Sequence, residues 1–128
     1  MFLRSSSSYF EHLNALSETL EASGKQPIAL VPVDEELEDE DLMEMVNAGL
    51  LPWTVVDEHK AKIWSAVFAD MASRTDIVIH EGGEIAWAMR KDSPLLRKVL
   101  DEFADAHKLG TTFGNMLKKR YMLSLIHI

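Results

Sequence analysis

The chain of 128 residues contains no cysteine. It can therefore form no disulfide framework, no thiolate zinc site and no cysteine nucleophile. Long apolar runs are also missing, because the longest fall far short of the roughly 20 residues that a membrane-spanning helix needs. With 47% hydrophobic and 27% charged residues, the composition is that of a globular protein. The length suits a single domain.

Basic residues are scarce in one segment, and this sets the net charge of −8. Residues 34–44 contain eight acidic residues and no basic one, which leaves 13 acidic and 13 basic residues in the rest of the chain. Proteins that bind nucleic acid or anionic membranes need a basic face. A neutral body with one acidic segment therefore argues against nucleic acid as a partner. We expect the acidic segment to form a solvated face.

Apolar residues recur at helical spacing in some segments and form short, partly β-branched runs in others. Helices are expected over residues 7–23, 39–48, 58–70, 93–107 and 111–121. Strands are expected over residues 27–33, 53–57, 76–80 and 84–89. Strands separated by helices of this length are typical of βαβ units. The sequence thus predicts an α/β domain with a mainly parallel sheet and flanking helices.

Two places suit a ligand. Ser5 to Ser8 precede the first helix, where hydroxyls and free backbone N–H groups favour an anion. The alternative is that one of these serines simply caps the helix. Asp57 ends an apolar strand, and in open α/β sheets ligands gather at the carboxyl ends of strands. There its carboxylate could accept hydrogen bonds from an ammonium or a hydroxyl, or it could cap the helix that follows.

Motifs for catalysis and metal binding are missing from the sequence. There is no G-x-S-x-G elbow, no P-loop and no G-x-G-x-x-G. The five histidines are scattered, without a pair at i, i+4, and the acidic segment lacks the alternating oxygens and central glycine of an EF-hand loop. We predict no catalytic residue, no metal and no cofactor.

Three stretches of the chain, taken in order, carry a family resemblance. They are the helix, glycine, strand and aspartate of residues 41–57, IAWAMRKDSPLL at residues 85–96 with the helix to Phe103, and Gly110-Thr111 ahead of KKRY at residues 118–121. In order and spacing they resemble the second half of a family 3 bacterial solute-binding domain, which has the type II periplasmic-binding-protein fold.

Shorter motifs narrow this resemblance to a subgroup. They are RSSSSY at residues 4–9, EDL at residues 40–42, NAGLLP at residues 47–52 and EGGEIAW at residues 81–87. These motifs are similar to the solute-binding domain of membrane-bound lytic murein transglycosylase F and its relatives. The similarity covers about residues 3–122.

The resemblance implies a two-lobed protein that closes on a ligand. Residues 1–84 would form lobe two, and residues 85–122 would be an incomplete return to lobe one that starts with a crossover strand at 85–89. Ser6, Ser7 and Ser8 would meet an acidic group of the ligand, and Asp57 its amino group. The serine run replaces the family's usual Gly-Thr, which leaves the identity of the amino-acid- or muropeptide-like ligand open.

The implied function is ligand sensing in peptidoglycan turnover. The parent protein would be a lyase of the periplasm, attached to the outer membrane, with a lysozyme-like transglycosylase domain after this chain. The catalytic glutamate would lie in that domain, so this chain would not itself be an enzyme. The missing lobe one and the downstream domain would be its partners. The alternatives are a stand-alone periplasmic substrate-binding protein of an amino-acid ABC transporter and a generic α/β interaction domain.

The last six residues, Leu123 to Ile128, read LSLIHI. This is the translation of CTG-TCT-CTT-ATA-CAC-ATC, the sequence of a transposon-end adapter used in DNA library preparation. We therefore expect residues 123–128 to derive from an adapter and the chain to be a fragment. A natural apolar tail is the alternative.

Overall fold

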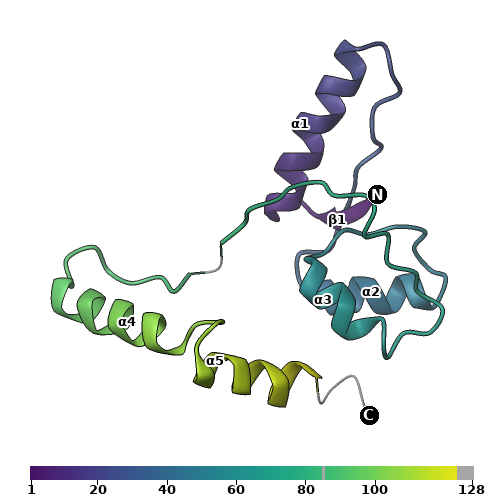
Figure 1. Cartoon of the computed structure of the whole chain (residues 1–128). Helices are drawn as coiled ribbons and strands as arrows, with labels where there is room; N and C mark the ends of the chain where they lie inside the picture. Colours follow the sequence, from purple (N-terminus) through teal and green to yellow (C-terminus); the bar gives the residue numbers. More distant parts are fainter. Residues whose placement is uncertain (85, 124–128) are drawn as a thin grey trace. The chain divides into compact units, whose positions relative to one another are not determined.

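A computed structural model describes residues 1–84 and 86–123, and its chain divides into two compact units (Figure 1). The first is Met1–Gly82, and the second begins at Gly83. The elements of the first unit are β1 (Phe2–Arg4), α1 (Ser8–Ala22), β2 (Val31–Val33), α2 (Asp39–Asn47) and α3 (Glu58–Trp64). Those of the second unit are α4 (Pro94–His107), α5 (Thr112–Leu117) and the π-helical turn η1 (Lys118–Leu123).

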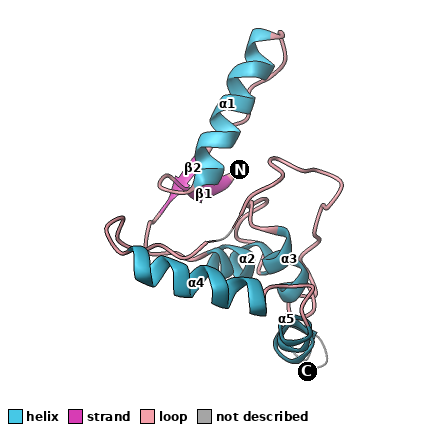
Figure 2. Ribbon diagram, turned by 60° about the vertical axis from the view of Figure 1, so that its left-hand side comes forward, coloured by secondary structure: helices cyan, strands magenta, loops and turns pink. Residues whose placement is uncertain are grey.

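The first unit is built on one βαβ crossover. β1 and β2 pair in parallel, with Phe2 opposite Val31 and Arg4 opposite Val33, and α1 connects them. Figure 2 shows both strands beside the first turn of α1. Within the described residues, this unit thus combines helices with a parallel sheet of two strands. Its assignment to lobe two of a periplasmic-binding-protein fold stays a prediction.

The core of the first unit is small. Its side chains under 2% exposed are Leu3 of β1, Leu13 of α1, and Leu42 and Met43 of α2. Leu51, after α2, is also buried. The core thus combines a buried leucine of β1 with buried apolar residues from each of two helices, as the helical spacing in the sequence predicts.

Three of the predicted strands are wrong and the fourth is shorter than predicted. Residues 53–57 are extended beside β1, where the Phe2 N–H donates to the Trp53 carbonyl (3.1 Å) and the Thr54 hydroxyl donates to the Phe2 carbonyl (3.0 Å). These two bonds stop short of a ladder. Residues 76–80 form turns and loop, as do the described residues of the predicted 84–89 strand, while Ile85 lies outside the described residues. In the fourth predicted strand, residues 27–33, the segment that pairs with β1 is Val31–Val33.

The helices match the predictions more closely. α1 and α2 lie within a residue of the predicted bounds, and α4 begins at Pro94. The predicted helix 58–70 instead ends at Trp64 and continues as turns. The predicted helix 111–121 is α5 followed by η1. None of the helices in the described part is long and apolar enough to cross a membrane.

The second unit is held together by a row of aromatic rings. The ring of Phe103 stacks on Trp87 and on His107, with centroids 6.0 and 4.0 Å apart, and His107 meets the edge of Phe113 at 4.7 Å. An apolar face of α4 is exposed in this unit, since Leu95 is 82% and Val99 61% exposed. Of the six residues attributed to an adapter, 124–128 lie outside the described residues.

Candidate functional site

The site predicted from the sequence lies at the N-terminus of α1. Ser7 occupies the N-cap position in an extended conformation. Its hydroxyl accepts a hydrogen bond from the Phe10 N–H (3.3 Å) and donates one to the Arg4 carbonyl (2.8 Å). Ser8 is the first residue of the helix and is exposed. Ser7 therefore caps the helix, as in the alternative considered from the sequence.

Ser6 is bound to a carboxylate from the acidic segment. The Glu35 side chain accepts hydrogen bonds from the Ser6 N–H (3.2 Å) and from the Ser6 hydroxyl. The hydrogen bond from this hydroxyl is the main reason why the pKa of Glu35 lies below its ordinary value of 4.5. An acidic group thus lies next to the N-terminus of α1, where the helix dipole favours a negative charge, but the group belongs to the chain itself.

Asp57 comes to the same end of α1. It stands at the N-cap position of α3, but its carboxylate interacts with the hydroxyl of Tyr9 in the first turn of α1. Burial, together with the hydrogen bond to Asp57, raises the pKa of Tyr9 above its ordinary value of 10.0. Asp57 therefore interacts with the first turn of α1, which directly follows the serines.

A buried ion pair network supports this arrangement. The Asp39 side chain is 8% exposed, at the start of α2, and meets the guanidinium of Arg4 (3.3 Å) and the ammonium of Lys60 (2.8 Å). The hydrogen bond to Asp39 raises the pKa of Lys60. β1, α2 and α3 are thereby tied to one carboxylate. The prediction that the acidic segment is solvated is therefore wrong for Asp39. Its carboxylate is buried because two cations compensate its charge.

Sequence reasoning missed Glu35, Asp39 and Tyr9. The density of acids over residues 34–44 signals that some carboxylate could reach a helix N-terminus. The sequence does not indicate which carboxylate does so, because this depends on how residues 34–44 pack against β1 and α1. Tyr9 gave no signal apart from its place beside the serines.

The electrostatic balance of the site favours a cation. Glu38 lies 3.4 Å from Arg4, and Glu40 lies 3.7 Å from Lys60. The acidic side chains that contact Ser6, Tyr9, Arg4 or Lys60 therefore outnumber these two cations; they are Glu35, Glu38, Asp39, Glu40 and Asp57. Such a site can bind an ammonium group by charge and hydrogen bonding.

Histidines elsewhere in the first unit do not add to this site. The rings of His12 and His80 stack with centroids 4.2 Å apart. Within residues 1–84 and 86–123, no group of three or more potential ligands is placed to hold a metal ion.

Comparisons with known proteins found no significant match for this chain, whether among protein-family models, curated proteins or solved structures.

Proposed function

We propose that this chain is a ligand-sensing solute-binding domain of a membrane-bound lytic murein transglycosylase-like protein that acts in peptidoglycan turnover. Its ligand would be small and amino-acid- or muropeptide-like. The proposal is supported by the ordered motifs in the sequence. The structural observation that supports it is the interaction of Asp57 with Tyr9, which lies in the first turn of α1 and follows the serines in the sequence.

Each proposed ligand residue has a defined role. Asp57 accepts hydrogen bonds from the ligand's ammonium, in the position that the Tyr9 hydroxyl takes here. Ser6, Ser7 and Ser8 offer N–H and hydroxyl donors to the ligand's acidic group. Glu35 holds the Ser6 donors in this structure, so an acidic ligand has to displace it. The chain itself performs no catalysis in this proposal, since the transglycosylase glutamate belongs to a separate domain.

The proposed setting is the periplasm, with the parent protein attached to the outer membrane. Lobe one of the parent would supply the other wall of the cleft. We therefore expect the isolated chain to bind free amino acids weakly or not at all, because half of the ligand's contacts are missing.

Long-read sequencing of the same locus tests the parent assignment directly. A frame that continues past Tyr121 into a lysozyme-like domain with a glutamate-serine motif supports the proposal. A stop codon soon after Tyr121, with lobe-one strands encoded upstream, identifies instead a transport-type binding protein.

Calorimetric titration of the protein encoded by the extended frame then tests the site. Probes are single L-amino acids and a muropeptide. Asp57→Asn is expected to reduce the affinity for the bound probe at least tenfold, and Glu36→Gln, an exposed neighbour of Glu35, should leave it unchanged. If Asp57→Asn binds the probe with the same affinity as the wild type, Asp57 does not take part in ligand binding.

A further inference from the structure

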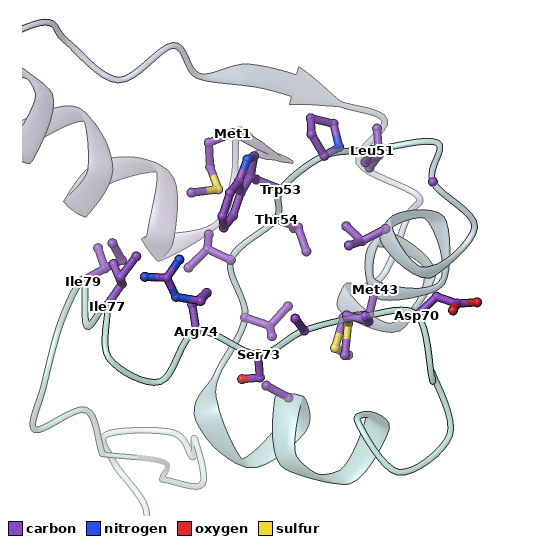
Figure 3. A pocket seen from close by; sticks show the side chains of 18 residues that line it. Met1, Met43, Leu51, Trp53, Thr54, Asp70, Ser73, Arg74, Ile77 and Ile79 are labelled. Carbon is purple, nitrogen blue, oxygen red and sulfur yellow. The ribbon is translucent and has the colours of Figure 1, made fainter.

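The first unit contains a hollow that is separate from the proposed cleft residues. It has a volume of about 710 Å³ and lies between α2, α3 and the loops that follow each of them (Figure 3). Ser6, Ser7, Ser8 and Asp57 are not among its lining residues as the structure describes them. The volume falls within the range of small-molecule sites, roughly 300–1,000 Å³.

The walls of the hollow are mainly apolar. They include Met1, Met43, Trp53, Val55, Met71 and Ile77. Met43 belongs to the packed core, whereas the Trp53 side chain is 52% exposed and lies across one side of the hollow (Figure 3). An indole exposed in this way offers a flat face on which a ring can pack.

The charged groups on the rim are hydrogen-bonded within the chain or turned outward. The Met1 ammonium donates to the Ala29 carbonyl (2.8 Å). Arg74 makes two hydrogen bonds to Asp76, at 2.8 and 2.7 Å, and these bonds lower the pKa of Asp76 to about 2. The carboxylate of Asp70 points away from the hollow (Figure 3). A charged ligand would therefore lose hydration without meeting an unpaired partner among these groups.

We propose that this hollow binds an uncharged, mainly apolar small molecule with a flat ring that packs on Trp53. This inference does not depend on the proposed function, because it uses neither Asp57 nor the serines.

Energy transfer from Trp53 tests the proposal on the full chain. With Trp64→Phe and Trp87→Phe, Trp53 is the one tryptophan left, and each replacement keeps a ring against its neighbour. The probe is N-phenyl-1-naphthylamine, which is uncharged and accepts energy from indole. We expect saturable transfer, and affinity at least fivefold weaker for the anionic analogue 8-anilinonaphthalene-1-sulfonate. Absence of saturable transfer, or equal affinity for the two probes, overturns the proposal.

Filling the hollow provides the second arm. Ala61→Phe places a ring in the hollow from α3 and should weaken binding at least tenfold, whereas Ala66→Phe, on an exposed turn outside the lining, should not change it. Ala72→Phe, from a lining loop, repeats the test if Ala61→Phe fails to fold. Unchanged binding by the filled variant overturns the proposal. So does loss of binding in Val99→Glu, which would assign the probe to α4.

Discussion

Glu35 and Ser6 are joined at the N-terminus of α1, with one carboxylate accepting from both the N–H and the hydroxyl of the serine. A helix N-terminus attracts an anion, and here the acidic segment supplies it. The same contact fixes the loop that leads from β2 to α2. In the proposed function, Glu35 competes with an acidic ligand group for the same donors.

Glu35→Gln should make stability less dependent on pH in the acid range. The pKa of Glu35 is lower in the folded chain than its ordinary value of 4.5. The contact therefore stabilises the fold above pH 4.5, and this contribution disappears as the pH falls through the lower, folded value. Urea unfolding is measured over a series of pH values. The midpoint concentration should be higher for the wild type than for the variant at pH 7, and equal for both in strong acid. Glu36→Gln is the control, and a difference that persists unchanged in acid would contradict this account.

Asp39→Asn should destabilise the first unit by about 2 kcal/mol. Breaking a buried ion pair costs roughly 3–5 kcal/mol, but the Arg4 and Lys60 side chains are 21% and 29% exposed, so water compensates part of the loss. Urea unfolding followed by far-UV circular dichroism measures the change. Glu44→Gln, an exposed position on the same helix, should have little effect. A loss below about 0.5 kcal/mol for Asp39→Asn would show that the network is not stabilising.

Tyr9 should ionise at a lower pH once Asp57 is removed. Tyr121→Phe leaves Tyr9 as the one tyrosine, so absorbance at 295 nm follows this hydroxyl alone. Burial and Asp57 raise its pKa above 10.0, so the unfolded chain releases this proton first and stability falls as the pH rises above 10. Asp57→Asn should shift the titration downward. An unchanged titration would mean that the two side chains do not interact in solution.

Gly114→Ala should disrupt the turn from α4 into α5. A Cβ at this position would lie 2.1 Å from the Lys108 carbonyl oxygen, so the backbone has to move. Overpacking of this kind costs roughly 1–3 kcal/mol. Gly83→Ala is the matched control, because a Cβ there meets nothing within 4 Å. Thermal unfolding at 222 nm should separate the two variants, and equal curves would refute the close approach.

Val99→Glu should make the chain more monomeric. The open apolar face of α4, with Leu95 and Val99 largely exposed, is of the kind that promotes association. A charge at its centre opposes burial. Ala104→Glu adds the same charge on the polar side of α4, outside the face that carries Leu95 and Val99, and should leave the sedimentation profile as in wild type. A wild-type chain that is monomeric at all concentrations would contradict this expectation.

The helices could be predicted from sequence because their signals are local. α1 and α2 end where Gly24 and Gly49 adopt φ values of 72° and 73°, a conformation that favours glycine. Strands depend on a partner elsewhere in the chain. The apolar run at 76–80 therefore predicted a strand wrongly, and Ile77 is 53% exposed in the absence of a described pairing.

The candidate site could be predicted in part for the same reason. A serine before a helix and an aspartate after an apolar run are both visible in the sequence. The contacts that join Asp39 to Arg4 and Lys60 link three elements. They depend on how those elements pack, which no local pattern specifies.

The parallel pairing of β1 with β2 has a practical consequence for protein engineering. The Met1 carbonyl accepts from the Val31 N–H (2.8 Å), and the Met1 ammonium donates to the Ala29 carbonyl (2.8 Å). The ladder therefore reaches the first residue. A purification tag fused ahead of Met1 would replace that ammonium by an amide and begin directly alongside residues 27–29, where its own backbone can extend the sheet.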